Sequence, residues 1–83
     1  MVAELGTIET GQYPINKIAL DRSGTRAIAA SDDGSIKVLN MKTFKQEGEL
    51  HGHESAVQSV AIAPNDAFFV SGSSDSTFKI WAK

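Results

Sequence analysis

The 83-residue chain contains no cysteine, two prolines and no long hydrophobic run. Without cysteine, no disulfide can staple the fold and no thiolate metal site can form, which fits a reducing compartment. No uninterrupted apolar stretch exceeds four residues, whereas a membrane-spanning helix needs about 20. The N-terminus also lacks the basic start and apolar core of a signal peptide. We therefore expect a cytoplasmic protein without a membrane partner.

The chain also lacks an excess of charge of one sign. Eight Lys and Arg residues stand against ten Asp and Glu residues, for a net charge of −2, and the basic residues are dispersed. Nucleic acids attract concentrated Lys and Arg, so we expect no nucleic-acid partner. The apolar content of 41% is typical of a soluble globular domain with a modest core.

The chain does contain an internal repeat with a period of 42 residues, so that one domain, 1–83, divides into copies 1–41 and 42–83. Residues 15–41 align on 57–83 without a gap. Identical or similar residues recur in short alternating stretches, including Ala19/Ala61, Ser31/Ser73, Asp33/Asp75, Lys37/Lys79 and Ile28/Val70. Because the matches alternate, they predict strands and not helices.

Eight short strands are predicted between turn-forming residues. They cover Ala3–Ile8, Ile15–Asp21, Arg26–Ser31, Ser35–Asn40, Gln46–Leu50, Val57–Ala63, Phe68–Ser73 and Thr77–Ala82. Several of these strands carry apolar residues on both faces, which predicts sheets that are covered on both sides.

The second copy contains Gly52-His53, Ser71-Gly72, Asp75 and Ile80-Trp81, and with these residues it resembles the WD40 repeat. The resemblance implies an all-β fold: two four-stranded antiparallel blades of a β-propeller, packed face to face. The chain begins on a candidate outer strand and stops after an inner one, so the last blade lacks its own outer strand and the ring is incomplete. Two blades leave an unpaired edge, and such repeats need about three copies for stability. We expect self-association or pairing with other propeller blades.

The resemblance also assigns a structural tetrad: Trp81 donates to Ser71, which is linked to His53 and then to Asp75. Three of these residues, Ser71, His53 and Asp75, are by type also those of a hydrolase triad. A nucleophilic serine needs an exposed hydroxyl on a strained turn, whereas Ser71 lies inside a predicted strand. We therefore expect no catalytic residue and no enzyme, and keep the hydrolase as a remote alternative.

The first copy departs from this pattern. Gly11, Ala29 and Leu39 replace the histidine, serine and tryptophan, and Asp33 alone remains. Since this blade has no histidine to leave unpaired, the sequence predicts that Asp33→Ala destabilises the protein less than Asp75→Ala does. His51 and His53 alternate on a strand, but without further ligands nearby we expect no metal. No motif indicates a cofactor.

The function indicated is a non-catalytic scaffold that offers a protein- or peptide-binding surface. Resemblance to WD40 blades places that surface on the loops around Tyr13, Asn16, Asp32, Ser55, Gln58 and Ser74. Hydroxyl, amide and carboxylate groups suit recognition of a peptide better than of an apolar ligand. The stretch from Gly11-Gln12-Tyr13-Pro14 onward also resembles the closing blades of axonemal WD40 proteins. That alternative predicts a structural role in a cilium or flagellum, with a cytoskeletal location.

Overall fold

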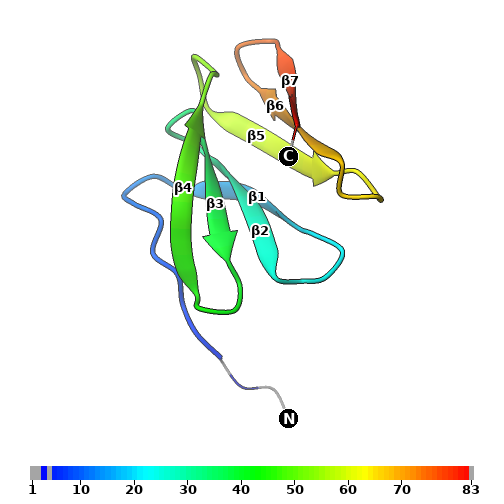
Figure 1. Cartoon of the computed structure of the whole chain (residues 1–83). Helices are drawn as coiled ribbons and strands as arrows, with labels where there is room; N and C mark the ends of the chain where they lie inside the picture. Colours follow the sequence, from blue (N-terminus) through cyan, green and yellow to red (C-terminus); the bar gives the residue numbers. More distant parts are fainter. Residues whose placement is uncertain (1–2, 4, 83) are drawn as a thin grey trace.

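A computed structural model describes residue 3 and residues 5–82 of the chain. This part of the chain contains seven strands (Figure 1). They are β1 (Ile15–Leu20), β2 (Arg26–Ser31), β3 (Ser35–Asn40), β4 (Lys45–His51), β5 (Val57–Ile62), β6 (Phe68–Ser73) and β7 (Phe78–Ala82). No helix capable of crossing a membrane occurs within these residues. The all-β prediction is confirmed, and each observed strand lies within two residues of a predicted one.

The strands form two antiparallel meanders, in which each strand pairs with its neighbour in sequence. The first sheet has the order β1-β2-β3-β4 and the second has the order β5-β6-β7. The repeat extends to backbone detail, because Gly24 and Asp66 have φ values of 74° and 59° in matching turns. Gly34 and Ser76, also 42 residues apart, have φ values of 88° and 74°. The same sequence period thus produces the same hairpins twice.

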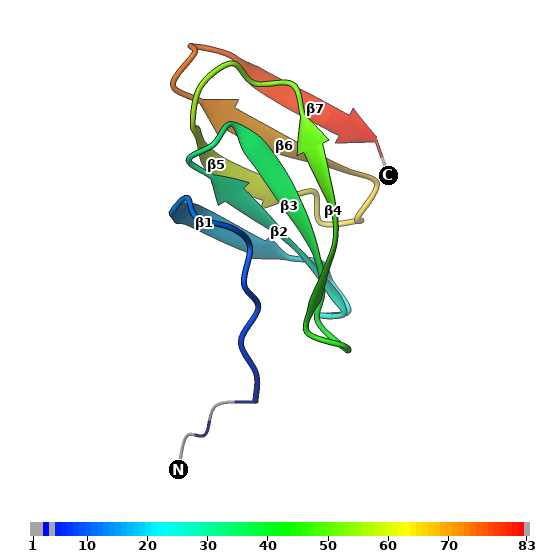
Figure 2. The same ribbon diagram turned by 90° about the vertical axis from the view of Figure 1, so that its left-hand side faces the viewer.

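The core lies between the two sheets, which face each other in Figure 2. The first sheet contributes mainly Ile28, Ala30 and Ile36, and the second contributes Val57, Val60 and Phe69, all of them buried. Burial of apolar surface stabilises a protein by about 25 cal/mol for each Å² removed from water. Burial of these side chains therefore holds the two sheets together. A second cluster, made of Ala27, Ala29 and Leu39, covers the opposite face of the first sheet.

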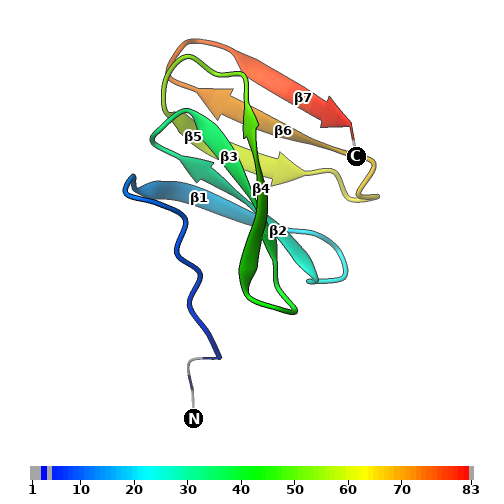
Figure 3. The same ribbon diagram turned by 60° about the vertical axis from the view of Figure 1, so that its left-hand side comes forward.

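The prediction of a strand over Ala3–Ile8 is wrong for the described residues 3 and 5–8, which form no strand. A strand needs a neighbouring edge to receive its hydrogen bonds. This segment instead runs beside the first sheet, on the side away from the second sheet (Figure 3). Ile8 packs there against the Ala27, Ala29 and Leu39 cluster, and Gly6 lies against the ring of Phe44.

The second sheet has three strands in the described chain. In the first sheet β4 pairs with the outer edge of β3, whereas no described strand pairs with the outer edge of β7. Phe78 and Ile80 on the outer face of this sheet are 74% and 68% exposed. The described residues thus form one four-stranded sheet and one three-stranded sheet.

Candidate functional site

Four chain segments meet at one end of the two sheets (left-hand side of Figure 2). They are the segment before β1, the β2–β3 turn, the β4–β5 connection and the β6–β7 turn. Backbone bonds join them in pairs, since Asp32 N donates to Pro14 O at 3.0 Å and Ser74 N donates to Ala56 O at 3.1 Å. The six residues predicted to form a binding surface are all exposed: Tyr13, Asn16, Asp32, Ser55, Gln58 and Ser74. Their role in binding stays a prediction.

Asn16 also makes a contact between the sheets. A β-bulge between Ile15 and Lys17 takes Asn16 out of the β1–β2 register. Its Nδ2 then donates to Val57 O at 2.9 Å and to Asp32 Oδ1 at 3.2 Å. Sequence reasoning placed Asn16 at the surface and missed this bridge. The amide therefore serves the fold as well as the surface.

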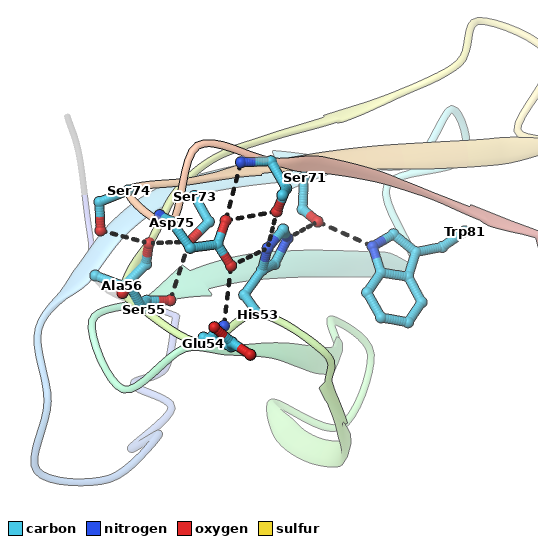
Figure 4. A network of polar contacts seen from close by, with 10 residues as sticks. His53, Glu54, Ser55, Ala56, Ser71, Ser73, Ser74, Asp75 and Trp81 are labelled. Atoms are coloured by element: carbon cyan, nitrogen blue, oxygen red, sulfur yellow. Dashed lines mark hydrogen bonds and ion pairs between the residues drawn. The ribbon is translucent and has the colours of Figure 1, made fainter.

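The tetrad residues of the second copy form one line of polar contacts (Figure 4). Trp81 Nε1 donates to Ser71 Oγ at 2.9 Å, and Ser71 Oγ lies 2.7 Å from His53 Nε2. On the other side of the ring, His53 Nδ1 is 3.5 Å from Asp75 Oδ2. A neutral imidazole protonated on Nδ1 satisfies all these contacts in one direction: Trp81 to Ser71, Ser71 to His53, and His53 to Asp75.

Asp75 ties this line to two segments of backbone. Its Oδ2 accepts from Glu54 N at 3.0 Å, and its Oδ1 accepts from Thr77 N at 2.9 Å and from the Thr77 hydroxyl. The Thr77 hydroxyl and Glu54 N–H bonds, with smaller help from Thr77 N–H and His53, hold the pKa of the Asp75 carboxyl well below its usual range. The carboxylate therefore fastens the β4–β5 connection to the β6–β7 turn.

Ser71 has a triad-like line of partners but not the access that a nucleophile needs. It is 1% exposed within β6, and its oxygen lies between Trp81 and His53. A substrate carbonyl would have to displace the Trp81 indole to reach it. The contacts instead satisfy the hydrogen-bonding groups of a buried serine.

The first sheet holds a different polar cluster at the matching place. Lys37 is 2% exposed, and its Nζ lies 3.0 Å from Asp33 Oδ2 and 2.7 Å from Glu49 Oε1. Asp33 Oδ1 accepts from Ser35 N and Ser35 Oγ at 2.9 and 2.6 Å, as Asp75 does from Thr77. A buried lysine thus takes the place of the histidine as the partner of this aspartate.

Sequence reasoning missed Lys37 and Glu49. The available signal was a lysine repeated at Lys37 and Lys79, within strands that are otherwise apolar. The prediction that Asp33→Ala is the milder change rested on the lack of a histidine in this copy. The structure gives Asp33 a buried lysine as its partner instead. His51 is exposed on β4, and its Nε2 lies 3.1 Å from Glu49 Oε2.

The stability of the protein is expected to fall in acid because of these two aspartates. Burial would raise the pKa of Asp33, but hydrogen bonds from Ser35 and Lys37 outweigh it and lower the pKa, as in Asp75. An unfolded aspartate has a pKa of about 3.9. The unfolded state therefore takes up protons at a higher pH than the folded state does, and protonation favours unfolding.

The free energy of unfolding should thus be nearly constant above about pH 5 and should decline as the pH falls through about 4 towards 2. Urea midpoints measured at several pH values check this, and Asp33→Asn should show a smaller decline than the wild type. A wild-type midpoint that does not change across that range would contradict the assignment.

A family model described as "WD domain, G-beta repeat" matches residues 3–40 and 44–82. Several curated proteins are similar to the chain. WD repeat and HMG-box DNA-binding protein 1 of Xenopus laevis is 36% identical over 66 residues, covering 80% of this chain and 6% of that protein. Striatin-4 of Homo sapiens is 33% identical over 73 residues, covering 88% and 10%.

Periodic tryptophan protein 2 homolog of Neurospora crassa is 41% identical over 66 residues, covering 78% of this chain and 7% of that protein. The chain therefore spans a tenth or less of the length of these relatives. The similarity concerns the repeat unit and not the whole proteins.

Proposed function

Because the chain belongs to the WD40-repeat family, we propose that it is a non-catalytic scaffold segment whose loops bind a protein or peptide within a closed ring of blades. The observation that carries the proposal is the loop end described above. Polar side chains are exposed there, while Asp75, Asn16 and Asp33 fix the backbone beneath them by hydrogen bonds. A rigid surface with exposed amide, hydroxyl and carboxylate groups suits peptide recognition.

A display library of peptides, selected on the folded protein, tests this proposal. Asp32→Ala and Ser55→Ala should weaken the selected peptides several-fold while leaving the melting temperature nearly unchanged, because both side chains are exposed. Lys42→Ala, an exposed change in the turn between β3 and β4, is the matched control and should leave affinity unchanged. Equal affinities for all three variants and the wild type would place peptide binding away from the loop end.

The accessibility of the Ser71 hydroxyl distinguishes a scaffold from a hydrolase. A small serine-directed phosphonylating probe should leave the native protein unlabelled, because Ser71 Oγ is buried. Ser71→Ala should lower the free energy of unfolding by roughly 1–3 kcal/mol, since the Trp81 N–H and His53 lose their partner. Mass spectrometry and urea unfolding measure the two effects. Stoichiometric labelling at Ser71 would make the hydrolase the better reading.

Narrower roles stay proposals that rest on the sequence. The DNA binding stated in the name of the Xenopus protein is not carried to this chain, whose basic residues are dispersed and which covers 6% of that relative. A cytoplasmic location is proposed from the composition, chiefly the lack of cysteine. A place in the closing blades of an axonemal WD40 protein is proposed from the run that begins at Gly11–Pro14 and continues through Asn16, Asp21 and Ser23-Gly24.

A further inference from the structure

Asn16 and Asp32, both exposed and both from the first copy, form a hydrogen-bonded pair at the loop end. Asn16 Nδ2 donates to Asp32 Oδ1 at 3.2 Å and to Val57 O at 2.9 Å. Asp32 is also held through its backbone, because its N donates to Pro14 O at 3.0 Å. The carboxylate of Asp32 is therefore fixed to the start of β1 and, through Asn16, to β5.

The two partners of Asn16 determine which way its amide points. A backbone carbonyl and a carboxylate only accept hydrogen bonds, so the amide nitrogen must face both of them and both of its N–H groups are used. Among the described residues, no donor bonds to the amide oxygen, Asn16 Oδ1, or to the second carboxylate oxygen, Asp32 Oδ2. The pair thus offers acceptors, and no donor, to a ligand.

The charge of Asp32 is not neutralised from within the loop end. Its four segments, residues 11–14, 32–34, 52–56 and 74–76, contain no Lys or Arg. In the part of the chain that the structure describes, the ion pairs of the other carboxylates do not include Asp32. A cation that reaches this carboxylate must therefore come from a partner.

We propose that Asn16 positions Asp32, and that the two side chains together bind the charged end of a Lys or Arg side chain of the partner peptide. The inference rests on the proposed peptide binding and names the chemistry that the peptide must carry. Ammonium and guanidinium groups only donate hydrogen bonds, and their bonds to a carboxylate are stronger than those between neutral groups. Because Asn16 holds the carboxylate in advance, less side-chain entropy is lost on binding. Tyr13, 57% exposed in the adjoining segment, offers an aromatic ring to the aliphatic stem of such a side chain.

The second copy lacks this pair of side chains. Gln58 stands 42 residues after Asn16, also at a β-bulge, but Ser74 stands in the place of Asp32. Since a hydroxyl carries no charge, the preference for a cation is expected from the first copy alone.

Three display libraries of one design test the inference. They carry arginine, lysine or glutamine at one fixed central position and no other basic residue. Peptides selected on the wild-type protein from the arginine or lysine library should bind roughly three- to tenfold more tightly than the same peptides with glutamine at that position. This ratio of affinities is the cation selectivity, and comparison of the first two libraries distinguishes a guanidinium from an ammonium group.

Asp32→Asn keeps the shape of the side chain and an acceptor for Asn16 but removes the charge, so the cation selectivity should vanish. Asn16→Ala keeps the charge and removes the positioning, and should lower the selectivity roughly twofold to threefold. In an Asp32→Asn background, Asn16→Ala should lower it no further. Asn40→Ala is the matched control: it removes another amide–carboxylate bond, to Glu47 at 3.0 Å, at the opposite end of the first sheet, and should leave the selectivity unchanged.

The outcomes separate this inference from the proposed function. If Asn16 served the fold alone, Asn16→Ala would weaken the cationic and the neutral peptide alike, and the positioning role would be overturned. A wild-type selectivity near one, or an undiminished selectivity in Asp32→Asn, would overturn the binding of a cation by this pair and leave peptide binding intact. Failure of all three libraries to yield a binding peptide would overturn the proposed function, and this inference with it.

Discussion

Gly34→Ala is expected to destabilise the protein clearly more than Gly24→Ala. Both glycines have left-handed backbone, with φ values of 88° and 74°, where an L-residue costs roughly 1–2 kcal/mol. The two sites differ in their surroundings. A Cβ on Gly34 would lie 3.1 Å from His53 O and 3.2 Å from Ser55 O, whereas a Cβ on Gly24 would meet nothing within 4 Å.

Gly34→Ala must therefore displace the loop that carries His53, in addition to adopting an unfavourable φ. Urea unfolding of both variants measures the difference in their free energies of unfolding. Gly24→Ala is the control, because it carries the same backbone cost without the contact to the loop. In Gly34→Ala the environment of Trp81 should also change, because His53 contacts Ser71 and Ser71 contacts Trp81; tryptophan fluorescence reports this. Equal midpoints for the two variants would show that the loop adjusts without cost.

Asp33→Ala is expected to lower the free energy of unfolding by roughly 1–3 kcal/mol, the range for a buried polar group that loses a partner. Its effect should be comparable to that of Asp75→Ala. Lys37 is buried and would keep Glu49 alone as its ionic partner, and Ser35 would lose the acceptor for its N–H and hydroxyl. Losing one of its two carboxylate partners is costly because the charge of the buried Lys37 side chain is desolvated.

A double-mutant cycle isolates this cause. In a Lys37→Met background no buried charge is left unpaired, so Asp33→Ala should cost less there than in the wild type. If Asp33→Ala costs the same in both backgrounds, Lys37 is not the reason for the loss. If it costs less than about 0.5 kcal/mol in the wild type, Asp33 behaves like an ordinary surface residue.

The strands could be predicted because local chemistry determines them. Alternating apolar residues and turn formers define each hairpin, and the 42-residue period provided a second copy as a check. The segment over Ala3–Ile8 was the exception, because whether an extended segment becomes a strand depends on a partner edge. No pattern within the segment itself reveals whether such an edge is present.

The residues of the polar clusters could be predicted from the sequence only in part, for a similar reason. The positions of His53, Ser71 and Trp81 follow a recurrent pattern, and the structure brings these side chains together with Asp75. Lys37 fits no such pattern, since a lysine in a strand is usually solvated. Its burial depends on Glu49, which comes from the adjacent strand in the β3–β4 register. The bridge from Asn16 to Val57 likewise depends on how the two sheets face each other.

The meander connectivity described above also bears on how the chain folds. Every strand pair joins neighbours in sequence, so each hairpin closes a short loop, and such local contacts form quickly. Contacts between β1 and β5, and between β2 and β5, join residues much farther apart in the chain. Each sheet can therefore form before the two sheets meet, and the slow step should be their docking. Until the two sheets dock, their apolar faces stay exposed to solvent. The chain is therefore most prone to aggregation before this docking step.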